Sequence, residues 1–193
     1  LKVMSASPSD VQPVLDIVAD RAAQLCRADG GRVWLADGDR LRANAISGQG
    51  ASYGRDALGS ELMLRSTSVV GRAFLEGRTI HIDDVVPLMD SEYPDVRKLQ
   101  ATNGFRTVLA VPMIRDGRAI GAIALLRNHV RPFSSAEVAL VQTFSDQAVI
   151  AIENVRLFNE TKEALEQQKA SAEVLQVISS SVADTTPVFE KIL

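Results

Sequence analysis

The residues of this chain that could do chemistry are few and lie far apart in the sequence. Cys26 is the only cysteine, His81 and His129 are the only histidines, and Asp83 and Asp84 form an adjacent acidic pair. A single thiol can form neither an internal disulfide nor a thiolate-rich metal site. Adjacent carboxylates on a strand point to opposite faces, so we expect the acidic pair to end a strand rather than to act as acid and base.

Neither histidine has a second histidine, a cysteine or a carboxylate at metal-ligand spacing. His81 shares a face of an expected strand with Thr79 and Asp83, so it is a candidate for the border of a pocket. The sequence also lacks a nucleophile elbow and a phosphate-binding glycine loop with its lysine. We therefore expect no enzymatic activity and no bound metal, and the cofactor stays unassigned.

The composition limits which partners and which cellular compartment are expected. The 193 residues carry a net charge of −3 without a dense run of lysine or arginine, which argues against nucleic acid as a partner. No apolar stretch approaches the roughly 18 residues that a membrane span needs, so no membrane segment is expected in this sequence. Hydrophobic residues make up 46% of the chain, enough for a core, and the single cysteine suits a reducing cytoplasm.

The hydrophobic pattern of the first third predicts a helix followed by a hairpin. Apolar residues recur every three or four positions from Asp10, the expected N-cap, to about Ala28, with Pro13 in the first turn. The run "GGRVWLADGDRLRANAISG" then predicts two strands around a turn at Asp37-Gly38-Asp39. Residues 48–68 are rich in Gly and Ser and are expected to be irregular.

The middle of the chain predicts a short helix, a strand, a helical loop and a second hairpin. "VVGRAFLEG" is expected to be a helix that Gly77 ends, and "RTIHIDDV" a strand with Ile80 and Ile82 on one face. "PLMDSEYPDVRKLQATNG" is expected to be a loop with a helical turn or two. In "FRTVLAVPMIRDGRAIGAIALLRN" two apolar runs flank Asp116-Gly117, which predicts an antiparallel hairpin covered on both faces.

A long helix is predicted after this hairpin. Ser134 and Glu137 form a capping box, and Phe133 and Val138 can pack together around it. No Pro or Gly follows until Pro187, so the helix is expected to reach about residue 178, a length of roughly 65 Å.

The chain ends on a partial repeat of its own beginning. "LQVISSSVADTTPVFEKIL" matches "LKVMSASPSDVQPVLDIVA" at an offset of 174 residues, from Leu1 to Leu175. A domain-sized period indicates tandem copies of one unit. We therefore expect residues 1–9 to end a preceding linker, 10–159 to form one domain, 160–180 to form a coiled-coil linker, and 181–193 to begin a second, truncated copy.

The order of these elements resembles the GAF family of sensory domains. Three phrases carry the resemblance in the right order, namely "VVGRAFLEGRTIHIDDV", "GFRTVLAVPMIRDGRAIGAIAL" and "FSSAEVALVQTFSDQAVIAIENVRLF". The resemblance covers about Asp10 to Asn159 and is to a tandem GAF unit of a bacterial sensor histidine kinase or nucleotide cyclase. It implies an α+β fold with an antiparallel sheet of about six strands, helices on both faces and a long C-terminal signalling helix.

The resemblance also implies a small-molecule pocket on the face of the sheet opposite the first and last helices. The residues expected there are mostly aromatic, with a few polar groups: Trp34, Phe74, His81, Tyr93, Phe105, Arg106 and Thr107. Such a lining suits a small ligand. The same residues would fill a core in a family member that has lost its ligand, and the sequence leaves both alternatives open.

Three specialised branches of the family depend on residues that this chain lacks. Its single cysteine lies on the wrong element for free-methionine sulfoxide reductase chemistry or for holding a bilin, so a buried structural cysteine is expected. Asn128, Phe133 and Glu137 match the pattern of cyclic-nucleotide-binding relatives, but His129 and Ala136 replace its lysine and aspartate. The ion pair that braces that pocket cannot form, so cyclic-nucleotide binding is the weakest alternative.

Apolar residues seven apart on the long helix predict a parallel homodimer. The seam consists of Phe144, Ala151, Phe158, Leu165 and Ala172. The other core position is mixed or polar, which predicts a weakly fixed register that can shift between two packings. We therefore expect a sensory module of a multidomain two-component signalling protein, which binds a small ligand or a partner and signals through this helix to further GAF and output domains. The alternative is a ligand-free dimerisation and spacer domain.

Overall fold

The computed structural model describes residues 11–48 and 58–183, with side chains as far as residue 175. In chain order the elements are α1 (Gln12–Leu25), β1 (Gly30–Asp37), β2 (Arg40–Gly48), β3 (Glu61–Met63), α2 (Val69–Glu76), β4 (Ile80–Ile82), the 3-10 turns η3 (Val86–Leu88) and η4 (Pro94–Val96), α3 (Arg97–Asn103), β5 (Thr107–Arg115), β6 (Arg118–Arg127) and α4 (Ser135–Ala183). The described part contains no helix with both the length and the hydropathy needed to cross a membrane.

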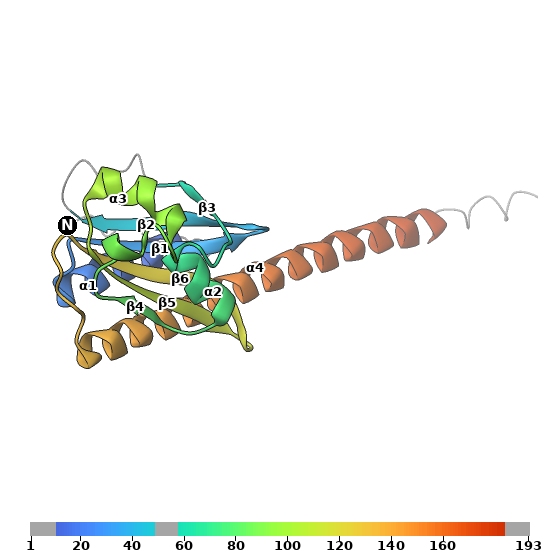
Figure 1. Cartoon of the computed structure of the whole chain (residues 1–193). Coiled ribbons are helices and arrows are strands. Elements are labelled where there is room, and N and C mark those ends of the chain that lie inside the picture. The colour runs from blue at the N-terminus through green and yellow to red at the C-terminus, as the bar shows by residue number, and fades with distance from the viewer. Residues whose placement is uncertain (1–10, 49–57, 184–193) are drawn as a thin grey trace, which may run out of the picture.

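The six strands form one sheet in the order β3-β2-β1-β6-β5-β4, and each neighbouring pair is antiparallel. Figure 1 shows α1 and α4 against one face of this sheet and α2 and α3 over the other, with α4 extending far beyond the sheet. We call these the α4 face and the α2 face. The expected α+β fold, with six antiparallel strands, helices on both faces and a long C-terminal helix, is confirmed.

Both predicted hairpins are confirmed, and their turn residues explain them. Gly38 and Asp39 connect β1 to β2, and Gly38 has a φ of 62°. Asp116 and Gly117 connect β5 to β6 with φ values of 50° and 76°, so both central residues are left-handed. Such a turn matches the right-handed twist of the flanking strands, which is why Asp-Gly predicts a two-residue hairpin.

The boundaries of α1 and the content of residues 48–68 differ from expectation. Val11 is the N-cap of α1 and makes no side-chain capping bond, while the expected N-cap, Asp10, lies outside the described residues. The helix ends at Leu25 rather than near Ala28, because Arg27 takes a positive φ of 45°. Within the segment expected to be irregular, β3 pairs with β2 as a three-residue edge strand too short to give a sequence pattern.

The start of α4 is the predicted capping box. The backbone N–H of Ser134 donates to Glu137 Oε2 at 2.8 Å, and the N–H of Glu137 donates to Ser134 Oγ at 3.3 Å. The helix has 49 residues and continues to Ala183, beyond the expected end near residue 178. It passes both proposed domain boundaries, after residues 159 and 180, without a break, and most of the proposed second copy lies outside the described residues.

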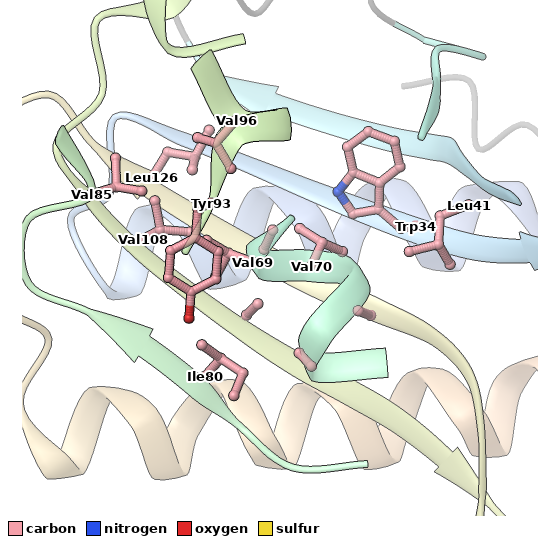
Figure 2. Packing of buried hydrophobic residues seen from close by; sticks show 14 of the residues in the cluster. Trp34, Leu41, Val69, Val70, Ile80, Val85, Tyr93, Val96, Val108 and Leu126 are labelled. Carbon is pink, nitrogen blue, oxygen red and sulfur yellow. The ribbon is translucent and has the colours of Figure 1, made fainter. Parts of the chain in front are cut away.

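Alternating side chains of the strands form a separate hydrophobic cluster on each face. On β5, Val108 and Ala110 pack in the cluster of the α2 face, and Leu109 and Val111 pack in the cluster of the α4 face. This arrangement follows from the consecutive apolar residues of the strand, which leave neither face suited to water. Figure 2 shows part of the α2-face cluster.

Candidate functional site

The α2 face contains a small apolar cavity. Its volume is about 30 Å³, and its lining residues are Leu62, Ser68, Val69, Val70, Asp95, Val96, Leu99, Phe105, Val108 and Leu126. Figure 2 shows Val96, Leu126, Val108 and Val69 close together beside the start of α2. Ser68 and Asp95 supply the only polar side chains of this lining. A mostly apolar wall with a few polar groups is typical of a small-molecule site, although this volume holds only one or two water molecules.

Residues 85–105, which we call the cover segment, make up most of the connection between β4 and β5 and supply Val96, Leu99 and Phe105 to the lining. The two ends of the cover segment are held together. The N–H of Val85 donates to the carbonyl oxygen of Arg106 at 2.8 Å, and Arg106 Nε donates to Asp84 Oδ1 at 2.8 Å. The hydrogen bond from Arg106 keeps the pKa of Asp84 below its ordinary value in spite of partial burial.

A second group of contacts holds the middle of the cover segment against α2. Arg72 Nη1 donates to Glu92 Oε2 at 3.0 Å and to the hydroxyl oxygen of Tyr93 at 2.9 Å. The guanidinium also lies over the Tyr93 ring, 4.4 Å from its centroid. Tyr93 is buried in the α2-face cluster, and this burial raises the pKa of its phenol. Arg72 therefore joins α2 to the segment that covers the cavity.

Trp34 is the only tryptophan of the chain, and it packs in the same cluster with 2% of its surface exposed. Within the part of the chain that the structure describes, its Nε1–H has no hydrogen-bond partner. In Figure 2 the indole nitrogen lies on the side of the ring that faces Val70, a lining residue of the cavity. An unpaired buried donor lowers stability, so a ligand that brought an acceptor atom to Nε1 would gain affinity from that bond.

The structure brings four of the seven predicted pocket residues together. Trp34, Tyr93 and Phe105 are buried in the α2-face cluster, Phe74 packs against it, and Phe105 lines the cavity itself. Arg106 lies outside the lining and pairs with Asp84. The sequence analysis did not single out the aliphatic residues of the lining. It also missed the two polar lining residues, Ser68 and Asp95. Ser68 had a signal, since it directly precedes a helix and caps it by accepting the N–H of Gly71.

His81 and Thr107 lie on the α4 face, which corrects their expected place at the pocket. Ile80 and Ile82 pack in the α2-face cluster, so His81 between them points the other way, and its Nε2 accepts the N–H of Phe133 at 3.0 Å. The Thr107 hydroxyl donates to the carbonyl oxygen of Asp83 at 2.6 Å. The sequence placed both residues on the right strands, but the period-two alternation sends them to the opposite face.

Cys26 is fully buried at the end of α1, as expected of a structural cysteine. Its thiol lies 3.8 Å from the carbonyl oxygen of Glu137. Burial, reinforced by the nearby Glu137 carboxylate, raises the pKa of the thiol to about 11, so the reactive thiolate is scarce at neutral pH. No cluster of three or more His, Cys, Asp or Glu side chains that could hold a metal ion occurs among the described residues.

Arg127 joins β6 to the start of α4, and the sequence analysis did not single it out. Its side chain is 3% exposed, and Nη2 donates to the carbonyl oxygen of Cys26 at 2.5 Å and to Glu137 Oε1 at 2.6 Å. Nη1 donates to the carbonyl oxygens of Arg131 and Pro132 at 2.8 and 2.9 Å. The guanidinium lies 3.8 Å from the centroid of the Phe133 ring.

Glu137, one of the residues matching the cyclic-nucleotide pattern, is fully engaged by this network. Burial would raise the pKa of its carboxyl group, but hydrogen bonds from the Ser134 backbone and Arg127 outweigh burial and hold the pKa below the ordinary value. Its charge therefore serves the helix start rather than a ligand.

Two larger hollows open widely to solvent, away from the α2-face cavity. One, of about 430 Å³, lies beside the end of α1 and is lined by residues that include Asp20, Gln24 and Asn128. The other, of about 450 Å³, lies between β5 and α4 and is lined by residues that include Arg78, Pro112 and Asp146. Neither contains any of the predicted pocket residues, so they remain surface grooves of unassigned role.

The predicted dimer seam begins inside the domain and continues beyond it. Phe144 packs partly against the α4-face cluster of its own domain, and Ala151 is half-buried. Phe158 and Leu165 are 46% and 50% exposed, and Ala172 is also exposed. An exposed apolar row of this kind on a long helix is typical of a contact with a second helix.

Comparisons with known proteins agree with this architecture. A family model described as GAF domain matches residues 10–152, more than half of the chain. No curated protein sequence matches.

Three solved structures illustrate the likeness. A methyl-accepting chemotaxis protein (residues 122 to 287) is 26% identical with a TM-score of 0.63, covering 78% of this chain and 93% of that one. The second GAF domain of DevS from Mycobacterium smegmatis is 19% identical with a TM-score of 0.60, covering 80% and 99%. The blue-light absorbing form of the PixJ GAF domain from Thermosynechococcus elongatus is 16% identical with a TM-score of 0.68, covering 86% and 98%. The family match and the shared fold together show that this chain belongs to the GAF domain family.

Proposed function

We propose that this chain is a sensory module of a larger bacterial signalling protein, with a histidine kinase as the preferred output. In this proposal it works in the cytoplasm, binds a small ligand on the α2 face, and passes the signal along α4 to further GAF and output domains. The observation that carries the proposal is the apolar cavity beneath the cover segment. The structural likeness to a methyl-accepting chemotaxis protein supports the signalling context.

The ligand we propose is small, uncharged and largely apolar, with at least one hydrogen-bond acceptor. The lining offers apolar contact on most sides, and Trp34 offers a donor without a partner among the described residues. Binding requires the cover segment to move outward, because the cavity of about 30 Å³ is smaller than any such molecule. The contacts of Arg72 with Glu92 and Tyr93 are the bonds that this movement would break. No catalytic step is proposed, since the Cys26 thiol is buried and protonated.

The experiment uses Trp34 as its reporter. A chain labelled with 15N-tryptophan gives one indole N–H signal, because the sequence contains one tryptophan. We expect a ligand from a metabolite library to move this signal and to raise the melting temperature. Mass spectrometry of protein purified natively from cells identifies a retained ligand, and cyclic nucleotides, haem and bilins complete the panel.

A cavity-filling variant provides the control. Leu99→Phe adds volume at the lining from the α3 side. It should abolish the ligand-induced rise in melting temperature while leaving the domain folded. An undiminished rise in this variant would place the ligand at another site.

The second part of the proposal is a parallel homodimer formed along α4. Beyond the domain, the described side chains of residues 160–175 are all exposed. So long a helix is marginal in water without a partner, and Phe158 and Leu165 supply the apolar row. Because Phe144 packs partly on its own domain, the seam between the two copies would run mainly from Ala151 onward.

Leu165→Asp tests the dimer directly. It should convert a dimer into a monomer in light scattering while the globular domain stays folded. Gln167→Asp is the matched control, since it introduces the same charge two positions away, off the seam, and should leave the mass unchanged. An unchanged mass for Leu165→Asp would place the interface elsewhere, and a wild-type monomer at high concentration would remove this route of signalling.

One observation favours a second candidate, a ligand-free dimerisation and spacer domain. The cavity of about 30 Å³ has the size of a packing defect rather than of a preformed pocket. This candidate predicts the same Leu165→Asp monomer but no response of the Trp34 indole signal to any member of the panel.

A further inference from the structure

His81 connects the sheet to the start of α4, which we call the exit helix because it extends out of the domain. From β4 it points to the α4 face, where Nε2 accepts the backbone N–H of Phe133 at 3.0 Å. The two rings also meet edge to face, with centroids 5.7 Å apart. Phe133 directly precedes Ser134, the capping residue of α4. The imidazole therefore fixes the backbone at the point where the helix begins.

The hydrogen bond from Phe133 requires a neutral imidazole. A protonated imidazole carries a proton on both nitrogens and cannot accept a hydrogen bond. The same Nε2 lies 3.7 Å from Asp83 Oδ1, a carboxylate to which it can donate only when it carries a proton. The His81 side chain is 25% exposed, so protons reach it from solvent. One nitrogen atom thus has two competing partners, one for each protonation state.

The other charged groups at this point do not replace Asp83. Arg127 lies against the Phe133 ring and would repel a second positive charge there. The Glu137 carboxylate is occupied by Arg127 and by the N–H and hydroxyl of Ser134. Arg131, on the connector to α4, donates to the carbonyl oxygen of Arg27. Asp83 is therefore the carboxylate available to a protonated His81.

We propose that His81 is a proton-operated switch at the start of α4. In the neutral state Nε2 accepts the N–H of Phe133 and helps hold the connector of residues 128–134 against the sheet. On protonation Nε2 releases this N–H and pairs with Asp83 on its own strand, where the short distance requires only a small ring movement. The start of α4 then loses its hydrogen bond to His81 of the sheet. Acidification therefore changes how the start of the exit helix is held against the domain, without a ligand. This inference goes beyond the proposed ligand sensing and does not depend on it.

Amide hydrogen exchange of the full chain tests the switch. Histidine is the side chain whose ordinary pKa places its charge change between pH 5 and 8, so the measurement spans that range. The reference is the Glu137 amide, which is bonded to Ser134 Oγ. The exchange rate of the Phe133 amide relative to this reference should rise about tenfold from pH 7.5 to pH 5.5, the factor expected for the loss of one hydrogen bond.

Three variants test whether His81 causes the pH dependence of the exchange-rate ratio. His81→Gln keeps an acceptor for the Phe133 N–H without a titrating ring, so the ratio of exchange rates should no longer change with pH. His129→Gln, at the only other histidine, should keep the full change. Asp83→Asn removes the partner of the charged state and should move the change to lower pH.

Several results would overturn the switch. These are a ratio that stays constant with pH in the wild type, a pH-dependent ratio that persists in His81→Gln, and an unmoved midpoint in Asp83→Asn. The last variant also decides the matter if His81→Gln does not fold, because it leaves the neutral-state contact intact.

Discussion

The two faces of the sheet are built from the same strands but differ in how completely they are filled. On the α4 face a methyl group added at Gly121 would lie 2.2 Å from the carbonyl oxygen of Trp34 and 2.4 Å from Met113 Cε, so this position inside the cluster has no room for a side chain. On the α2 face a cavity of about 30 Å³ and the unpartnered Nε1–H of Trp34 remain among the described residues. The α4-face cluster is therefore filled around Gly121, while the α2-face cluster keeps a small internal space.

A short path through the backbone connects the two faces. Phe105 lines the cavity, and the N–H of the next residue, Arg106, donates to the carbonyl oxygen of Arg127 at 2.7 Å. The side chain of Arg127 in turn holds the start of α4 through Glu137 and neighbouring carbonyl oxygens. The substitutions below measure how strongly each face is fixed.

The largest expected effect is the loss of Arg127. Arg127→Met leaves Glu137 without its ion pair and three carbonyl oxygens without a donor on the α4 face. We expect the free energy of unfolding to fall by about 3 kcal/mol, at the lower end of values for breaking a buried pair. Urea denaturation followed by circular dichroism measures this loss.

Arg115→Met is the control for Arg127→Met. Arg115 also pairs with a glutamate of α4, Glu153, at 3.0 Å, but its side chain is 38% exposed. Water and salt screen such a pair, so its loss should be much smaller. Equal losses for the two variants would show that the Arg127 network is not the main tie between α4 and the sheet.

Gly121→Ala is expected to have the next largest effect. The added methyl group would overlap a backbone oxygen of β1, which can move away only by shifting the strand. We expect a loss of about 2 kcal/mol, within the range for overpacking a filled core. A neutral result in thermal or urea unfolding would show that the α4 face has more freedom than its packing suggests.

The pH dependence of stability can be compared for two acids, Glu137, which pairs with Arg127, and Asp84, which pairs with Arg106. Both have a pKa below the ordinary value, so each adds stability that is complete above the unfolded pKa and is lost as pH falls through the folded pKa. Glu137→Gln should reduce the loss of stability as pH falls from 6 to 3. Asp84→Asn should reduce it less, because its partner Arg106 is 39% exposed whereas Arg127 is 3% exposed.

The sequence predicted the features that depend on local signals. Asp116-Gly117 predicts a left-handed turn by itself, and Ser134 with Glu137 predicts a helix start from four residues. The consecutive apolar residues of β5 predicted burial on both faces. In each case the residues that carry the signal also make the contacts.

The sequence did not predict features that depend on distant partners. Arg127 binds the carbonyl oxygen of Cys26, which is 101 positions away and gives no side-chain signal. His81 and Thr107 were placed on the wrong face because strand phase follows the apolar neighbours Ile80 and Val108 rather than the polar residues. The cavity depends on how the cover segment packs over the sheet, and this packing cannot be predicted from the amino-acid composition.

The smallest expected effect is also the most direct comparison of the two faces. Val33 is fully buried in the α4-face cluster, and Val108 is 2% exposed and lines the α2-face cavity. Changing either to isoleucine adds one methylene in the middle of a strand, where β-branched residues are equally suited. Val33→Ile should lower the free energy of unfolding by about 1 kcal/mol, because its surroundings are filled. Val108→Ile should leave it unchanged or slightly raised, because the added methylene enters the cavity and gains apolar contact there. Equal losses at both sites in urea unfolding would mean that the α2 face is packed as tightly as the α4 face. In that case the room that distinguishes a sensing face from a structural one would be absent, and the spacer candidate would be favoured.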